Sequence, residues 1–153
     1  VFGPTPSDDP VISRILLGYA EELSEDSGNE AVAVIAHGAT NADANAEELQ
    51  ILKKHVGVIR AGGKFTAVRG FTLQDDAPTA IRNANIARIR GWVQAAMDRD
   101  ERVIVVTTLP SRGSVHEQIH EDLDGLEYVM SNQGLVEHPL FADWIESVIA
   151  SSR

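Results

Sequence analysis

The run from Ala31 to Ala36, AVAVIA, is the feature that most constrains how this chain can fold. All six residues are apolar and either small or β-branched, and turn and capping residues such as Gly38 and Asn41 follow them. A helix would need greater length, so a short run of this kind is typical of a central strand buried on both faces. We therefore predict a sheet built around this strand.

His37 directly follows the run and is placed at the carboxyl end of the predicted strand. In open α/β sheets, ligands bind in the crevice just beyond the carboxyl ends of parallel strands. An imidazole there can bind a metal ion or move a proton near neutral pH, and Gly38 leaves room for a close approach. His37 is thus a candidate site residue. The alternative is that it merely ends the strand and bonds a neighbouring carbonyl.

The rest of the chain alternates helical and extended patterns over short connections, which predicts one α/β domain with a parallel sheet covered on both faces. We expect residues 1–7 to be an arm and 8–153 a single domain that begins with a helix over 8–25. The third strand, over 102–109, is as apolar as the first and belongs beside it. We place a second strand in the first half of 64–73, a fourth and edge-like strand near 125–130, and helices near 41–61, 78–98, 115–123 and 138–151.

Composition narrows the classes of function. The formal net charge is −10, and no basic stripe stands out that could neutralise phosphates. Both observations argue against nucleic acid or an anionic membrane as the main partner. With no cysteine, thiolate catalysis and Cys-based zinc sites are excluded, and a metal site must use histidine and carboxylate. No run reaches the roughly 20 apolar residues of a membrane span. We expect a cytoplasmic protein and leave open a processed or exported form, because the chain starts at Val1.

Residues 116–120 spell HExxH, the motif that places two zinc-binding imidazoles one helical turn apart around a catalytic glutamate. This five-residue pattern is short, and the residues that follow lack the glycine and third histidine of the longer zinc-protease motif. We interpret the match as accidental, with His116 and His120 on a solvated helix face. A zinc metalloprotease is the remote alternative.

His116 and His120 have a second interpretation that involves His37. The three histidines follow the first and third strands, so they are expected at one edge of the sheet. Two neutral imidazoles from adjacent central strands can converge on one cation and leave coordination positions free. The candidate metal ligands are therefore His37, His116 and His120, whereas His55 and His138 are interpreted as structural or surface residues.

Three segments together resemble the CbiX-like family, the small class II chelatases that insert cobalt or iron into sirohydrochlorin. They are AVAVIAHG from Ala31, VIVVTTLPSRGSVHEQI from Val103 and GLVEHPLFADWI from Gly134. The resemblance extends over most of the chain from Ala31 onward. It implies a chelatase-like three-layer αβα fold with a four-stranded parallel sheet.

The resemblance also implies a site and an activity. His37 matches the family histidine after the first strand, and His116 matches the second one with a shift of one residue. These two residues would bind the metal or accept pyrrole protons. The family tends to carry a glutamate after strand two, where Asp75 and Asp76 are the nearest acids here. Arg69, Arg112 and Asp75 would contact the tetrapyrrole.

The metal, whether cobalt, iron or nickel, would be a substrate, and no organic cofactor is implied. A homodimer is plausible, because a single domain supplies half of the cleft wall of double-domain relatives. The alternative function is a chelatase-like domain that binds a metal or tetrapyrrole without turnover.

Overall fold

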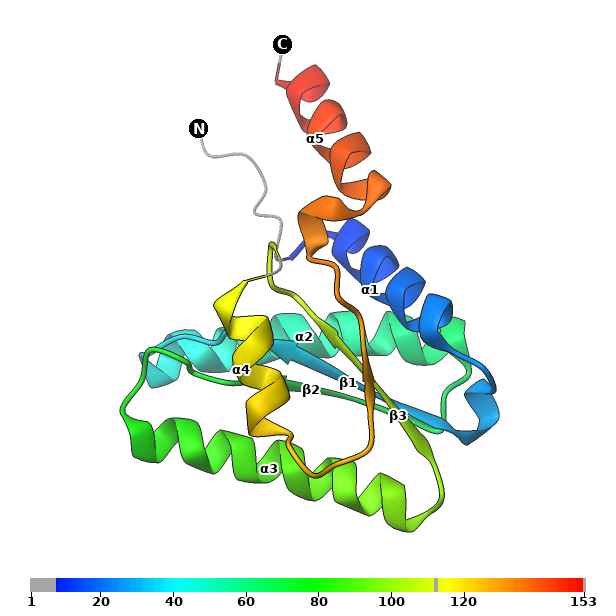
Figure 1. Cartoon of the computed structure of the whole chain (residues 1–153). Coiled ribbons are helices and arrows are strands. Elements are labelled where there is room, and N and C mark those ends of the chain that lie inside the picture. The colour runs from blue at the N-terminus through cyan, green and yellow to red at the C-terminus, as the bar shows by residue number, and fades with distance from the viewer. Residues whose placement is uncertain (1–7, 112, 153) are drawn as a thin grey trace.

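The computed structural model describes residues 8–111 and 113–152 as a sheet with helices on both faces (Figure 1). The predicted arm over 1–7 and Arg112 lie outside the described residues. The elements are α1 (Pro10–Leu23), η2 (Ser27–Asn29), β1 (Glu30–Ala36), α2 (Ala42–Gly63), β2 (Ala67–Thr72), α3 (Thr79–Asp98), β3 (Arg102–Thr107), α4 (Ser114–Asp122), β4 (Val129–Met130), η3 (Leu135–Glu137) and α5 (Pro139–Ser151).

The sheet has four strands in the order β2-β1-β3-β4, and every neighbouring pair is parallel. Val32 of β1 lies between Val68 of β2 and Ile104 of β3. The prediction of a four-stranded parallel sheet with the two most apolar runs in its centre is therefore confirmed. All seven residues of β1 are buried, because helices cover both faces of a parallel sheet.

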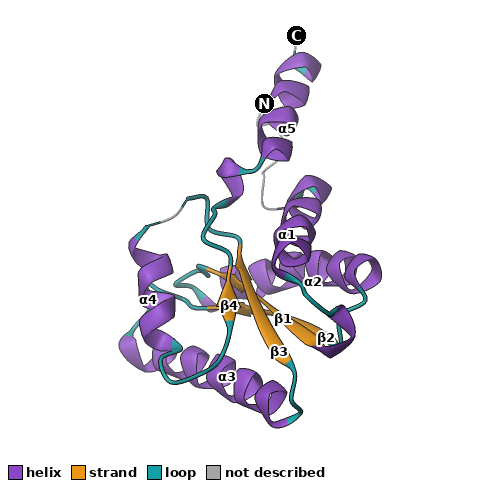
Figure 2. Cartoon of the chain, turned by 45° about the vertical axis from the view of Figure 1, so that its right-hand side comes forward, coloured by secondary structure: helices purple, strands orange, loops and turns teal. Residues whose placement is uncertain are grey.

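Figure 2 shows helices on both sides of the sheet, and alternate residues of β1 face two separate cores. Val32, Val34 and Ala36 pack with α1 and α2, whereas Ala31, Ala33 and Ile35 pack with α3 and α4. This alternation is the two-residue period of a strand, and it produces the three layers. Figures 1 and 2 also show α5 projecting away from the sheet, and none of its residues is buried.

The start of β2 differs from its predicted position. We predicted the second strand in the first half of 64–73, but β2 is Ala67–Thr72. The helix α2 runs on to Gly63, and Lys64 then turns the chain with a positive φ of 57°. Residues 64–66 are needed for that turn. Arg69 consequently lies inside β2 opposite Ala33, and not beyond the end of the strand, where the predicted contact with a tetrapyrrole would place it.

The described residues contain no helix that is both long enough and apolar enough to cross a bilayer.

The carboxylate of Glu30 ties α1 to the sheet at the amino ends of the strands. Its side chain is 2% exposed and accepts hydrogen bonds from Ser24 Oγ, Glu25 N, Asp26 N and Arg102 Nη1. Burial alone raises the pKa of this carboxyl, but the donors, led by the Glu25 N–H, outweigh burial and hold the pKa below its ordinary value. The predicted helix over 8–25 ends at Leu23 because Ser24 and Glu25 turn toward Glu30.

We expect Glu30→Gln to lower the free energy of unfolding by about 1–3 kcal/mol at pH 7, because the buried network loses the negative charge and one of the two oxygens that accept its hydrogen bonds. A lowered folded-state pKa stabilises the fold fully above the unfolded-state value, and this stability is lost as the pH falls through the folded-state pKa. Urea unfolding from pH 7 down to pH 3 should therefore show the two proteins converging at acid pH. Glu25→Gln is the control, since that side chain is 78% exposed and should change little.

Candidate functional site

His37 lies at the carboxyl end of β1, and its two ring nitrogens have different surroundings. Nδ1 lies 3.0 Å from the carbonyl oxygen of Gly38. Nε2 lies 3.9 Å from Oδ2 of Asp75 and 3.6 Å from Oδ2 of Asp76. A proton on Nδ1 would donate to the Gly38 carbonyl and leave the lone pair of Nε2 facing the two carboxylates. This orientation prepares the imidazole to bind a cation.

The backbone of the loop after β1 packs directly against the loop after β2. Gly38 has a φ of +81°, and a Cβ there would lie 2.7 Å from the backbone nitrogen of Gln74. The N–H of Leu73 donates to the Ala36 carbonyl, and that of Asp75 donates to the His37 carbonyl. The hydrogen bonding of β1 and β2 thus continues past the ends of the strands and carries Asp75 to His37.

Side chains from α3 and the loop itself hold the loop after β2. Gln74 is buried with a φ of 53°, and its Nε2 donates to the Ala39 carbonyl at 3.0 Å. Asn85 of α3 donates from Nδ2 to the Leu73 carbonyl and to Oε1 of Gln74. Arg82 of α3 donates from Nε to Oδ1 of Asp75 at 2.9 Å. The carboxylate of Asp75, which is only 16% exposed, is therefore fixed in orientation, whereas the side chain of Asp76 is 75% exposed.

His37, Asp75 and Asp76 can offer three ligand atoms to one metal ion. One ligand atom from each residue lies within 4.8 Å of the others. A set of one imidazole and two carboxylates suits first-row divalent metals, and water or substrate can complete the coordination. Among the described residues, no second group of three such side chains is this compact. Sequence reasoning assigned Asp75 to the tetrapyrrole and did not join it to His37 as a ligand.

A cavity of about 390 Å³ opens beside His37, between the strand ends and the helices α1 and α2. Its wall is mostly apolar, with residues from α1, α2, η3, α5 and the loop after β3. The lining residues are Ile12, His37, Glu48, Ile51, Leu52, His55, Thr108, Leu109, Pro110, Leu135, Val136 and Phe141. His37 thus belongs both to this wall and to the metal-competent group.

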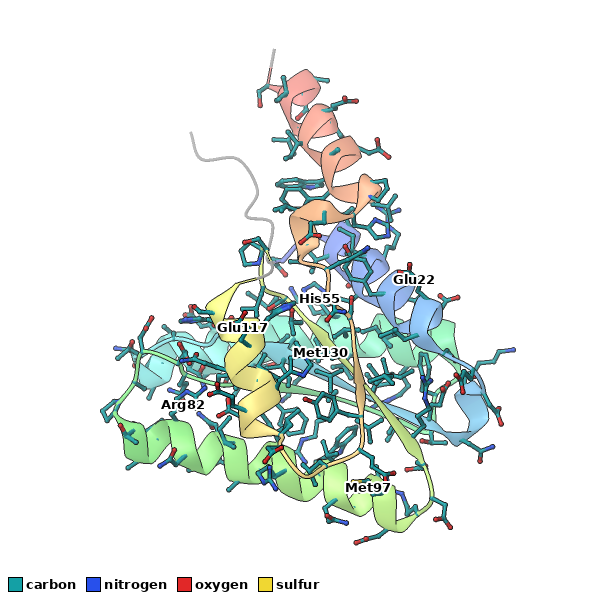
Figure 3. All side chains as sticks on the ribbon, in the orientation of Figure 1. Glu22, His55, Arg82, Met97, Glu117 and Met130 are labelled. Atoms are coloured by element: carbon teal, nitrogen blue, oxygen red, sulfur yellow. The ribbon has the colours of Figure 1, made fainter. Side chains whose placement is uncertain are left out.

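Two titratable residues of the cavity wall were not predicted as site residues. Glu48 and His55 lie seven positions apart on α2 and therefore on one face of that helix. Nδ1 of His55 lies 2.6 Å from Oγ of Ser13, and the His55 side chain is labelled beneath α1 in Figure 3. The helical spacing of Glu48, Leu52 and His55 was visible in the sequence. Which part of that face meets a cavity depends on the packing of α1.

The two histidines of HExxH lie on α4 and have other partners. His116 is buried, and its Nε2 lies 2.9 Å from Oγ1 of Thr107. His120 is exposed, and its Nδ1 lies 2.6 Å from the hydroxyl of Tyr128. The Tyr128 ring stacks on the His120 imidazole. Neither residue lines the cavity or joins the His37 group. His116 is therefore not on a solvated face as we expected, and this geometry does not favour a protease.

The other predicted contacts fall in different places. The guanidinium of Arg69 lies 5.2 Å from the ring centroid of Phe71 and lines a separate hollow between α2 and β2. Arg112 is outside the described residues. Nδ1 of His138 caps α5 by accepting from the N–H of Leu140, which agrees with a structural interpretation.

Comparisons with known proteins support the fold. No protein-family model matches the sequence, and no curated protein matches it. Among solved structures, the chain is similar to SirB from Bacillus subtilis with Fe³⁺, with a TM-score of 0.74 and 13% identity over 97% of this chain. It spans 56% of the SirB chain.

A second similar structure is DR2241 from Deinococcus radiodurans, a multi-domain protein with structural similarity to chelatases and two additional novel domains. Here the TM-score is 0.63 and the identity 16%, over 95% of this chain and 30% of that one. At such identities the likeness concerns architecture. The chain has a chelatase-like fold, as the resemblance noted in the sequence implied.

We expect Gly38→Ala to destabilise the protein by about 2 kcal/mol or more, because a side chain at positive φ would also press on the Gln74 backbone. Gly57→Ala is the matched control. Gly57 is exposed within α2, and nothing lies within 4 Å of an added Cβ. The Gly57→Ala variant should therefore be more stable to unfolding by roughly 0.5–1 kcal/mol, because alanine favours a helix over glycine. Urea unfolding measures both. Equal effects would contradict the close approach of the two loops.

Proposed function

We propose that this protein binds a divalent metal ion at His37, Asp75 and Asp76 and inserts it into a tetrapyrrole held in the adjacent cavity. Cobalt or iron is the proposed metal, with nickel as a further candidate, and sirohydrochlorin or a related macrocycle is the proposed acceptor. The observation that carries the proposal is the double position of His37, which lines an apolar cavity and faces two carboxylates.

The geometry suits transfer of a metal better than permanent retention. The His37 side chain is 37% exposed and that of Asp76 is 75% exposed, so water can reach the ion as it enters and leaves. Only Asp75, at 16% exposed, is sheltered. A metal held by exposed ligands exchanges them readily for ring nitrogens, provided that the macrocycle rests against the same residues.

Insertion also needs a group that accepts the protons released from the ring nitrogens. His37 could do so through Nε2 once that nitrogen has released the metal, and Glu48 supplies a second acceptor from the α2 wall of the cavity. The apolar remainder of the wall would pack against the macrocycle face. His116 is buried against Thr107 at the end of β3, and its predicted role as a ligand stays a prediction, as does a homodimeric assembly.

We expect purified protein to accelerate the spectral change that marks cobalt insertion into sirohydrochlorin, and His37→Ala to abolish that acceleration. Loss of a half-exposed strand-end side chain should leave the fold intact. His120→Ala is the control, since His120 is also an exposed histidine but lies on α4 beside Tyr128. Absorbance kinetics and circular dichroism measure the two effects.

Three other results would contradict the proposal in different ways. Binding of cobalt and sirohydrochlorin without a rate effect would favour a binding domain without turnover. A loss of activity in His120→Ala equal to that in His37→Ala would point to α4. An absence of binding of either ligand would leave only the fold.

We expect Val136→Trp to weaken sirohydrochlorin binding while leaving cobalt binding unchanged. Val136 is 46% exposed and lines the cavity. The indole ring of a tryptophan there would occupy the space proposed for the macrocycle without straining a packed core. Ile149→Trp is the control, because Ile149 is 50% exposed on α5 and does not line the cavity. Fluorescence titration with sirohydrochlorin and calorimetry with Co²⁺ separate the two ligands.

A further inference from the structure

We propose that Arg82 is a positioning residue that fixes Asp75 for metal binding and connects the metal site to α4. This inference rests on the proposed function, because it concerns one of the three proposed ligands. It goes further by assigning a task to a residue that touches neither the metal nor the macrocycle.

Arg82 bridges two carboxylates from different parts of the fold. Its Nε donates to Oδ1 of Asp75 at 2.9 Å, in the loop after β2. Its Nη1 and Nη2 donate to Oδ1 and Oδ2 of Asp122 at 3.1 and 2.8 Å, at the end of α4. Figure 3 labels Arg82 on the part of α3 that lies near α4. The guanidinium thus uses two of its edges at once.

The bridge is well sheltered from solvent. The side chains of Arg82, Asp75 and Asp122 are 18%, 16% and 16% exposed. The hydrogen bonds with Asp122, and then those with Asp75, hold the pKa of Arg82 above its already high ordinary value, so the guanidinium keeps its charge. Charge-assisted hydrogen bonds between arginine and carboxylates, especially bidentate ones such as that with Asp122, fix the geometry of the pair as well as stabilising it.

The two oxygens of Asp75 consequently have separate tasks. Arg82 binds Oδ1, whereas Oδ2 is the oxygen that faces Nε2 of His37. Without Arg82, rotation of the carboxylate could exchange the oxygens or turn both into water. Hydrogen-bonded partners that orient a metal ligand typically change metal affinity by about 10–100-fold when they are removed.

A merely structural role is the competing explanation, since Arg82 also holds α3 against α4. Arg90 strengthens the same contact by donating from Nη1 to the backbone carbonyls of Asp122 and Asp124. The Asp122 side chain tests this explanation, because Asp122→Asn weakens the α4 arm and leaves the Asp75 arm in place. A structural role predicts equal effects of Arg82→Gln and Asp122→Asn on metal binding.

The test is a Co²⁺ titration of the full chain, followed by the visible absorption of the bound ion, which reports its coordination. Arg82→Gln should weaken Co²⁺ binding about 10–100-fold, and the cobalt spectrum should approach that of Asp75→Asn. Asp122→Asn should change affinity by less than about threefold, although both variants lower thermal stability. In the Asp75→Asn background, Arg82→Gln should cause no further loss of affinity. Arg82→Lys replaces Arg82→Gln if the latter does not fold.

Each contrary result has a distinct meaning. Unchanged or tighter Co²⁺ binding in Arg82→Gln would overturn the positioning role and leave the proposed function standing. Equal losses in Arg82→Gln and Asp122→Asn, or additive losses in the double variant, would also overturn it. If the wild-type protein binds no Co²⁺, the proposed function fails, and the positioning role fails with it.

Discussion

The burial of β1 on both faces is the constraint on which the rest of the structure depends. Because every residue of this strand is covered, the chain must supply a helical layer for each face and a neighbour on each side. The parallel pairing with β2 and β3 meets the second requirement, and parallel pairing in turn requires helical crossovers. The three layers therefore follow from one strand that cannot face water.

The same pairing creates the candidate site. Parallel strands end at one edge, so the segments after β1 and β2 leave the sheet together. The glycine at 38 lets them approach until their backbones hydrogen bond, and this contact places Asp75 and Asp76 beside His37. The candidate site is consequently formed by the contact between the loops after β1 and β2. Arg82 connects this contact to α4, because its guanidinium binds both Asp75 and Asp122.

The cavity has a different origin. Residues of α1 and α2 line it beside the end of the sheet, and η3 contributes Leu135 and Val136 to its wall. The Tyr19 hydroxyl of α1 donates to the Gly134 carbonyl just before η3 at 2.8 Å, which holds that segment in place. Burial and the nearby Glu137 and Glu22 raise the pKa of Tyr19 to about 12, so its hydroxyl keeps the donated proton. Among the residues that the structure describes, His37 alone belongs to both the apolar wall and the metal-competent group.

The sequence was sufficient to predict which two strands are central and buried, that the sheet is parallel, roughly where most helices begin and end, and where His37 lies, because these features depend on local periodicity and on turn and capping residues. It failed at β2, where the turn after α2 moved the strand and left Arg69 inside the sheet. The folded structure was needed to show that Asp75 and Asp76 lie beside His37 and that His116 is buried against Thr107. Those relations depend on which loops touch and which way a side chain turns, and neither is encoded by spacing along the chain.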